Sequence, residues 1–279
     1  MSITVKSMNK QFGQNNHRVE ALAGINLEIT DGDFVSLVGP SGCGKSTLLN
    51  IIAGLDQATS GEVLIDGCTV QGPGSDRVMV FQESALFPWL SVLDNVMFGL
   101  KLKGIERREA KEKAHEYLKM VHLSRFTHAY PHELSGGMRQ RVAIARALVM
   151  DPKYLLMDEP FGALDEQTKI LLHAELQEIW QKTRKTILFV THNIREAVQL
   201  SNRILVFGTR PGFIKKEFTV PYSRPRSEGD QNLVLIERAI LDELREEIEK
   251  VMREEVDNDY NFTPGRLPWH TDRDLGSNI

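Results

Sequence analysis

The segment "GPSGCGKST", residues 39–47, has the composition of a loop that binds phosphate groups. It lies between the apolar runs "FVSLV" and "LLNIIAGL", so we expect it to join a buried strand to a helix. In such a loop backbone amides surround the β-phosphate, Lys45 reaches the β- and γ-phosphates, and the Ser46 hydroxyl ligates Mg²⁺. Thr47 is expected to begin the helix, whose positive N-terminal end attracts an anion. The residues predicted to bind a nucleoside triphosphate are Gly39, Pro40, Ser41, Gly42, Cys43, Gly44, Lys45, Ser46 and Thr47.

Two adjacent carboxylates follow a second apolar run, in "YLLMDEP". The run predicts a buried strand, and ligands of open α/β sheets collect at the carboxyl ends of such strands. Neighbouring side chains of an extended segment point in different directions, so the two groups can have different roles. We expect Asp158 to support Mg²⁺ through its water shell and Glu159 to polarise the water that attacks the γ-phosphate. The alternative is that the two carboxylates lie in a solvent-exposed loop and have no catalytic role.

Two further polar side chains follow apolar runs in the same manner. His192 comes after "TILFVT", and its predicted role is to contact the γ-phosphate. Gln82 comes after "VMVF", and its neutral amide can touch both the metal ion and the attacking water. The four predicted catalytic residues are Glu159, His192, Gln82 and Lys45, and the three predicted metal ligands are Ser46, Gln82 and Asp158.

A second glycine motif, "LSGGMRQR", lies about ninety residues after the first and opens another helical run. Ser135, Gly136 and Gly137 are predicted to expose a hydroxyl and backbone amides at a helix start. Because this segment is far in sequence from Lys45, its anion site is expected to point outward from the chain's own phosphate loop.

Two other residues each allow two interpretations. Asp165, in "FGALDEQT", is either the N-cap of the following helix or a group that contacts nucleotide. Phe12 is either part of the core of an antiparallel sheet or an aromatic ring that stacks on adenine.

The elements that position these residues follow from hydrophobic patterning. The runs at 34–38, 154–157, 186–190 and 204–207 are almost continuously apolar, which predicts a parallel sheet covered by helices on both faces. Alternation within residues 3–30 predicts antiparallel strands. Residues 94–122 and 138–150 are predicted to be helical, and the charged run "KGIERREAKEKAHEYLKM" is expected to form a solvated face.

Composition restricts the class of protein. The chain has 279 residues, 41% of them hydrophobic, which suffices for one large or two modest globular domains. A net charge of -4 argues against nucleic acid as a partner. Two cysteines, Cys43 and Cys68, are too few for a disulfide framework and favour a reducing cytoplasm. We expect no signal peptide and no membrane span, so that any membrane role depends on a partner.

The composition changes after Pro221, where a turn-rich linker begins. An amphipathic helix is predicted at about 232–255, with an apolar stripe that we expect to pack on the core rather than bind a partner. Residues 257–279 are polar and interrupted by prolines, which predicts an irregular tail.

In combination and order, these motifs resemble those of the nucleotide-binding subunit of an ATP-binding cassette (ABC) transporter, over about residues 2–220. "GPSGCGKST" resembles the Walker A loop, Gln82 the Q-loop glutamine, "LSGGM" the family signature and "YLLMDE" the Walker B strand. "GALD", which contains Asp165, resembles the D-loop, His192 the switch histidine, and Phe12 the aromatic residue under adenine.

The resemblance implies a fold: an α/β P-loop NTPase of RecA-like type, with a parallel-sheet core, an antiparallel β subdomain and an inserted α-helical subdomain at about 85–150. Residues 2–220 would form the ATPase domain and 221–279 a C-terminal extension. It also implies ATP and Mg²⁺ as cofactors and a head-to-tail homodimer. In that dimer the segment Ser135, Gly136 and Gly137 covers, in trans, the ATP held by the partner's phosphate loop.

Within this family, several shorter segments resemble those of the nitrate, sulfonate and taurine importer group. "LFPWL" after Gln82, Met138 in the signature and "YSRPR" fit that group, whereas Asn193 departs from its usual aspartate. The implied function is ATP hydrolysis at the cytoplasmic face of a membrane, as a peripheral subunit that powers permease subunits and, indirectly, an external solute-binding protein. We expect the permease to contact the loop between Gln82 and Asp94.

Alternative classes explain less of the sequence. Chromosome-associated ATPases of this type carry long coiled coils between the Walker motifs, but Lys45 and Asp158 are only 113 positions apart. Translation-associated members hold two cassettes in one chain. A GTPase or small-molecule kinase would leave "LSGG" unexplained, and the chain lacks an "NKxD"-type guanine motif.

Overall fold

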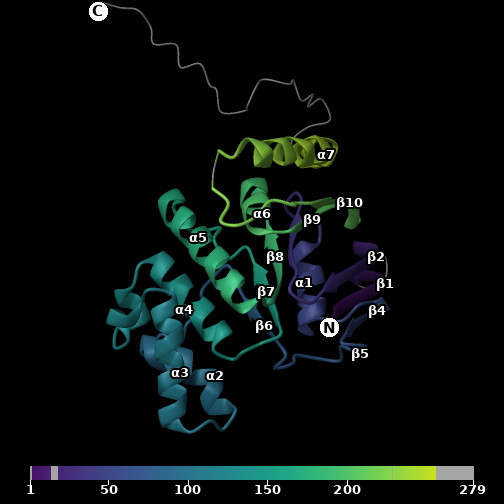
Figure 1. The fold of residues 1–279 in the computed structure, drawn as a ribbon. Helices are drawn as coiled ribbons and strands as arrows, with labels where there is room; N and C mark the ends of the chain where they lie inside the picture. The colour runs from purple at the N-terminus through teal and green to yellow at the C-terminus, as the bar shows by residue number, and fades with distance from the viewer. Residues whose placement is uncertain (1, 14–17, 228, 256–279) are drawn as a thin grey trace, which may run out of the picture.

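The computed structural model describes residues 2–13, 18–227 and 229–255, and its centre is a six-stranded sheet (Figure 1). The strand order is β10-β9-β3-β8-β7-β6, in which β10 runs antiparallel to β9 and the other pairs are parallel. Every residue of β3 and β8 is buried, as their continuous apolar runs predict. The strands are β3 (Phe34–Val38), β6 (Arg77–Val80), β7 (Tyr154–Asp158), β8 (Thr186–Thr191), β9 (Arg203–Gly208) and β10 (Phe213–Thr219).

A second, antiparallel sheet of four strands lies beside the first, in the order β2-β1-β4-β5. Helix α1 (Lys45–Ala53) joins the two sheets, because its Leu48 and Ile52 share one apolar cluster with Ile3 of the antiparallel sheet and Leu188 of the central sheet. The strands are β1 (Ser2–Phe12), β2 (Val19–Thr30), β4 (Ser60–Ile65) and β5 (Cys68–Thr69). Burial of α1 between two sheets holds the end of the phosphate loop in place.

Helices α2 to α4 form a separate region, at the lower left of Figure 1, away from α1. The region 94–122 is helical, as predicted, but it forms two helices, because the chain turns at Gly104, whose φ of 74° is left-handed. The elements here are α2 (Val92–Leu102), α3 (Arg107–Met120), η1 (Ser124–Phe126), η2 (Pro131–Glu133) and α4 (Gly136–Leu148), with α5 (Glu166–Thr183) packed against α4.

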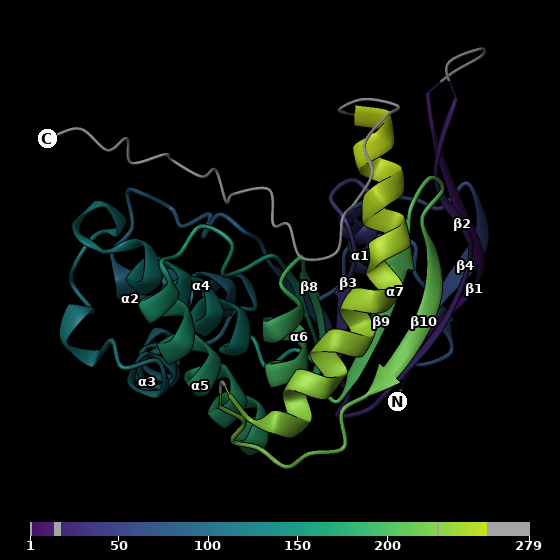
Figure 2. The ribbon, with the colours of Figure 1, turned by 90° about the horizontal axis from the view of Figure 1, so that it is seen from above.

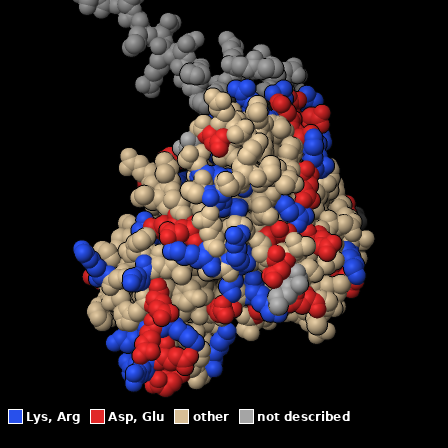
Figure 3. All heavy atoms as spheres, in the orientation of Figure 1, with Lys and Arg blue, Asp and Glu red and all other residues tan. Residues whose placement is uncertain are grey.

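The charged face predicted for this region is confirmed. Helix α3 buries only Ala110, Ala114 and Leu118. Exposed pairs such as Arg108–Glu112 line its surface, and Figure 3 shows basic and acidic groups intermixed there, at the lower left. Exposed pairs of this kind contribute little to stability.

Helix α7 (Gln231–Glu255) packs back onto the core, as predicted. Its Ile240 and Leu244 are buried against Ile204 and Val206 of β9 and against α6 (Ile194–Leu200). The view from above in Figure 2 shows α7 lying along β9 and β10. The predicted irregular tail at 257–279 lies outside the described residues.

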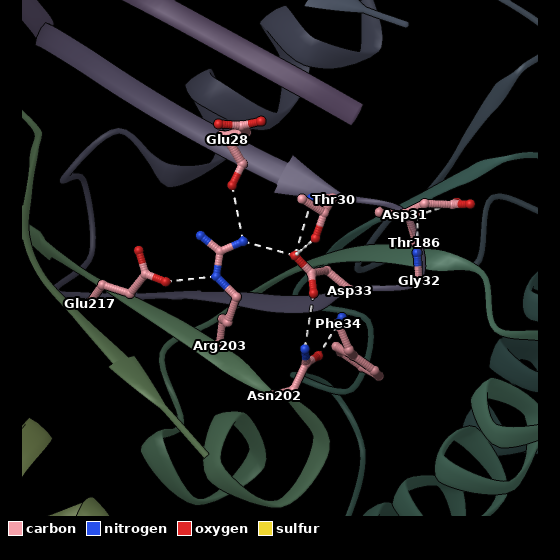
Figure 4. Close-up of polar contacts among 10 residues, drawn as sticks. All are labelled: Glu28, Thr30, Asp31, Gly32, Asp33, Phe34, Thr186, Asn202, Arg203 and Glu217. Carbon is pink, nitrogen blue, oxygen red and sulfur yellow. Dashed lines mark hydrogen bonds and ion pairs between the residues drawn. The ribbon is translucent and has the colours of Figure 1, made fainter. Parts of the chain in front are cut away.

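A partly exposed polar cluster joins the two sheets where β3, β8 and β9 begin (Figure 4). The Asp33 carboxylate accepts hydrogen bonds from Arg203 at 2.8 Å, from Asn202 at 3.1 Å and from the Thr30 hydroxyl at 2.7 Å. Arg203 also pairs with Glu217 at 2.6 Å. Burial alone would raise the pKa of Asp33, but these hydrogen bonds lower it below its ordinary value. This cluster lies at the N-terminal ends of the strands. The phosphate loop and its neighbouring residues lie at the opposite, carboxyl ends.

Candidate active site

The phosphate loop lies between β3 and α1, as predicted, and close contacts require glycine at Gly39 and Gly44. Gly44 has a φ of 93°, and a Cβ there would lie 2.6 Å from a methyl group of Leu22 and 2.8 Å from the Ala21 carbonyl oxygen. The helix begins at Lys45, two residues earlier than the expected start at Thr47. Lys45 is buried, and its ammonium donates hydrogen bonds to the carbonyls of Gly39 at 2.9 Å and Pro40 at 2.8 Å.

The turn at Gly212, which is distant in sequence, packs against the phosphate loop and its neighbours. The Gly212 amide donates to the Ala21 carbonyl at 3.0 Å, and the Ala23 amide donates to the Gly212 carbonyl at 2.9 Å. A Cβ at Gly212 would lie 2.1 Å from the carbonyl oxygen of Cys43, inside the phosphate loop. Burial raises the pKa of the Cys43 thiol, which keeps it neutral. Sequence reasoning did not assign Gly212 to the site, because "RPG" signals only a turn and says nothing of what the turn touches.

Ser46 and Asp158 meet at the carboxyl ends of β3 and β7. The Ser46 hydroxyl donates a hydrogen bond of 2.9 Å to Oδ1 of Asp158. Burial raises the pKa of Asp158, the Ser46 hydrogen bond opposes this rise, and the neighbouring Glu159 adds to it. A cation bound here would favour the ionised form of Asp158 and offset the cost of its burial.

Glu159 and His192 form a second pair on the neighbouring strand ends. The His192 Nδ1 lies 3.0 Å from Oε2 of Glu159. The Glu159 amide donates to the Val190 carbonyl at 2.9 Å, which ties the turn after β7 to β8. Glu159 itself has a φ of 44°, in the left-handed region that non-glycine residues seldom adopt. Strained backbone of this kind is common where a side chain must be aimed at a substrate.

Gln82 is the third side chain at this place. A Cβ on Gly162 would lie 3.2 Å from Nε2 of Gln82 and 3.6 Å from Oε2 of Glu159, so both groups border the same glycine. Gly162 is a second residue that sequence reasoning did not identify. Its missing side chain gives the Gln82 amide room beside the Glu159 carboxylate.

The second glycine motif caps helix α4. The Ser135 hydroxyl accepts a hydrogen bond of 3.3 Å from the Met138 amide, and Ser135 and Gly136 are exposed. Gly137 differs from the prediction: it is buried, and a Cβ there would lie 2.4 Å from a methyl group of Thr168 on α5. Its glycine identity is therefore required by helix packing. Figures 1 and 2 both show α4 apart from α1, so this motif lies away from the chain's own phosphate loop.

Asp165 is the N-cap of α5, as one of its two interpretations predicts. Its carboxylate accepts hydrogen bonds from the Thr168 amide at 2.9 Å and from the Thr168 hydroxyl at 2.7 Å. These bonds lower the pKa of Asp165 below its ordinary value. Since Thr168 also contacts Gly137, one residue of α5 links the Asp165 turn to the signature helix.

Phe12 does not belong to the core. It is 45% exposed at the end of β1, and the ammonium of Lys10 lies 4.7 Å from its ring centroid. An exposed ring at the end of a strand of the antiparallel sheet can stack on a planar base.

Comparison with known proteins agrees with this geometry. The family model described as "ABC transporter" matches residues 22–162. The nitrate import ATP-binding protein NrtD of Synechocystis is 53% identical over 79% of this chain and 83% of its own. The aliphatic sulfonates import ATP-binding protein SsuB of Bacillus cereus is 46% identical over 86% and 95%. The dimeric post-hydrolysis structure of the cassette MJ0796, bound to ADP and Pi, superposes with a TM-score of 0.70 at 37% identity, over 79% of this chain and all of that one.

Proposed function

The chain belongs to the ABC transporter family, and from that premise we propose that it hydrolyses ATP to import nitrate, an aliphatic sulfonate or a similar small anion. The observation that carries the catalytic part is the convergence of two polar pairs, Ser46–Asp158 and Glu159–His192, at one edge of the central sheet. The choice of solute is supported by the relatives named above. The experiments below separate these two parts.

The phosphate loop and the first pair are suited to Mg²⁺ and the nucleotide phosphates. Mg²⁺ is bound through few protein oxygens, with water and phosphate oxygens as its other ligands, and the Ser46 hydroxyl and Asp158 carboxylate supply such oxygens. The bound ion would neutralise charge on the β- and γ-phosphates. Lys45 contributes a fixed positive charge, and Phe12 stacks on the adenine ring. Remaining phosphate contacts come from backbone amides at positions 39–47.

The second pair performs the proton chemistry in this proposal. The Glu159 carboxylate accepts a proton from the attacking water, and the adjacent His192 keeps the carboxylate oriented and contacts the γ-phosphate. The Gln82 amide, beside the same carboxylate, orients the water. This division explains why two adjacent acids, Asp158 and Glu159, make contacts in different directions.

The signature motif of one chain contacts the ATP that is bound by a second copy of the chain. Ser135 and Gly136 present a hydroxyl and an amide at the start of α4, a helix that lies apart from α1 and its phosphate loop. In a head-to-tail homodimer they complete the partner's ATP site, and Asp165 approaches the same interface from the start of α5. Loss of the γ-phosphate removes the contact that favours closure, so hydrolysis reopens the dimer.

Within residues 2–13, 18–227 and 229–255, no helix has the length and hydrophobicity of a membrane span. In this proposal the solute crosses the membrane through separate permease subunits. We place the chain at the cytoplasmic face, attached through permease subunits that receive solute from an external binding protein. A groove of 380 Å³ beside Gln82, with walls that include Leu86, Arg139 and Leu164, is the proposed permease contact. Trp89, 70% exposed on the same loop, adds an apolar surface there.

The solute is tested with the assembled importer. The chain is co-purified with its permease and binding protein, and thermal stabilisation of the binding protein is measured with nitrate, alkanesulfonates, taurine and chloride as control. We expect one of the first three to raise the melting temperature and to stimulate ATP hydrolysis in proteoliposomes. Stimulation by none of them would refute the solute assignment, whereas the ATPase assignment depends only on ATP turnover.

A further inference from the structure

The turn that carries His192 is closed by a buried carboxylate. Thr191 accepts a hydrogen bond of 3.0 Å from the Asn193 amide, and its hydroxyl donates one of 2.6 Å to Oε2 of Glu196, inside α6. The Asn193 side chain caps α6 by accepting from the Arg195 amide at 2.9 Å. Glu196 is 4% exposed. The residues on both sides of His192 are thus bonded to the first turn of α6, while His192 itself reaches out toward Glu159.

The other oxygen of Glu196 faces α5. The His173 Nε2 lies 3.6 Å from Oε1 of Glu196, and the Lys169 ammonium lies 4.0 Å from it. Burial by itself raises the pKa of Glu196, but His173, Thr191 and Lys169 outweigh it and lower the pKa below its ordinary value. Glu196 is therefore an ionised group that links the His192 turn to the helix that begins at Asp165.

The opposite end of α6 is held by an arginine from the C-terminal linker. The Arg226 guanidinium donates to the carbonyls of Val198 at 2.9 Å and Ser201, at the end of α6. It also donates to the carbonyls of Val220 at 3.0 Å and Tyr222 at 2.8 Å, after β10. Burial lowers the pKa of Arg226 to about 10, so the group remains charged near neutral pH. A cation at the last carbonyls of a helix satisfies groups that the helix itself leaves unpaired.

Side chains of α5 and α6 recognise the main chain of Arg226 as well. Gln177 donates to its carbonyl at 3.2 Å and accepts from its amide at 2.9 Å, while Gln199 donates to the same carbonyl at 3.1 Å. The Gln199 oxygen lies 3.1 Å from Nδ1 of His173. Since that oxygen can only accept, Nδ1 carries the hydrogen. A continuous buried chain of contacts thus runs from Arg226 through Gln199 and His173 to Glu196.

We infer that Arg226 and Glu196 are positioning residues for His192: they hold the two ends of the seven-residue helix α6 and thereby fix the ring against Glu159. The C-terminal linker is then part of the hydrolytic machinery rather than only an attachment for α7. This inference rests on the proposed role of His192 in hydrolysis. Displacement of a catalytic group by about 1 Å can lower turnover about 100-fold. Loss of the contacts that Arg226 and Glu196 make with α6 should therefore lower the turnover measurably.

The test is a double-mutant cycle in the full-length chain. Arg226→Gln is expected to lower kcat for ATP about 10-fold, with KM and the affinity for a fluorescent ATP analogue changed less than twofold. In a His192→Ala background, the same substitution should change kcat less than twofold, because the residue that it positions is already gone. Arg108→Gln, on the exposed face of α3, is the matched control and should leave kcat unchanged.

A second variant covers the possibility that Arg226→Gln does not fold. Glu196→Gln keeps the shape and an oxygen for Thr191 but removes the charge that faces His173 and Lys169, and it should give the same non-additive loss. Unchanged kcat in a folded variant, additive losses in the His192→Ala background, or a loss confined to KM would overturn the inference. If His192→Ala alone keeps full turnover, the proposed role of His192 fails instead, which separates the two outcomes.

Discussion

Nδ1 of His192 lies 3.0 Å from Oε2 of Glu159, although 33 positions separate the two residues. The contact joins the carboxyl ends of β7 and β8 at the place where two parallel strands lie side by side. The His192 side chain is 57% exposed and that of Glu159 is 25% exposed, so the pair faces solvent on the side where a nucleotide can approach. We interpret this as one group oriented by another, which is the usual arrangement of a general base and its partner.

Glu159→Gln should stop hydrolysis while ATP binding continues. The amide keeps the size of the side chain and its contact with His192, but it cannot accept the proton of the attacking water. We expect kcat to fall at least about 100-fold, and a stable ATP-bound dimer to accumulate. Phosphate release and gel filtration with ATP measure the two effects, with Glu166→Gln on α5 as the control. Turnover close to that of the unmodified chain would falsify the assignment of the base.

Ser135→Arg should abolish dimerisation that depends on ATP. The hydroxyl is exposed at the start of α4, and a long cationic side chain would fill the space reserved for the partner's nucleotide. Affinity of the isolated monomer for ATP should change little, because α4, which Ser135 caps, lies apart from α1 and its phosphate loop. Sedimentation with ATP and a binding titration at low protein concentration measure both. A collapse of monomer affinity would contradict the assignment in trans.

The two signature glycines should differ in their tolerance of a methyl group. A Cβ at Gly137 would lie 2.4 Å from Thr168, whereas one at Gly136 meets Leu164 at 3.4 Å. We therefore expect Gly137→Ala to lower the free energy of unfolding by about 1 to 3 kcal/mol through overpacking. Gly136→Ala should be close to neutral or slightly stabilising, since alanine favours the helix. Urea unfolding of both variants is the measurement, and equal effects would refute the packing argument.

Acid stability should depend on Asp33. Its pKa is lower in the folded chain than in the unfolded chain, because Arg203, Asn202 and Thr30 donate hydrogen bonds to it. The unfolded chain therefore binds more protons as the pH falls below about 4, the ordinary pKa of Asp, and stability contributed by Asp33 is full above that pH and lost below it. Asp33→Asn should flatten this part of the curve of unfolding free energy against pH. If the unfolding free energy of Asp33→Asn changes as steeply between pH 5 and pH 3 as that of the unmodified chain, Asp33 does not determine acid stability.

Trp89→Ala should uncouple transport from hydrolysis. The ring is 70% exposed and contacts Phe87, with centroids 5.6 Å apart, on the loop after Gln82. Loss of an exposed apolar contact should weaken the permease interface without disturbing the catalytic pair. Solute uptake should fall about 10-fold, as when a hot-spot residue of an interface is removed, while basal ATPase activity of the isolated chain stays within twofold. Equal losses of both would argue against a coupling contact.

Local pattern was sufficient for much of the site. The loop at 39–47, the acids Asp158 and Glu159 and the residue His192 each follow an apolar run that ends at the same sheet edge. Parallel strands must align their carboxyl ends, so strand order alone brings such residues near one another. The helix at 231–255 was also predictable, because its apolar stripe repeats with helical period.

The helical region 94–122 is interrupted at Gly104, and here the glycine is itself a local signal for a left-handed turn.

Other features carry no local signal. Gly137 is predicted to be exposed at a helix start together with Ser135 and Gly136, yet the packing of α4 on α5 buries it against Thr168. Gly162 and Gly212 matter only for what approaches them from elsewhere in the fold.

The sequence by itself therefore determined which residues can bind phosphate and accept a proton, since those abilities belong to side-chain types and short loops. The tertiary structure decided which of them act together. Gln177, Gln199 and Arg226 are ordinary polar residues in the sequence, and they form one buried network only because α5, α6 and the C-terminal linker pack side by side. Burial makes each unpaired polar group costly, so the fold must pair them, and that pairing connects the linker to His192.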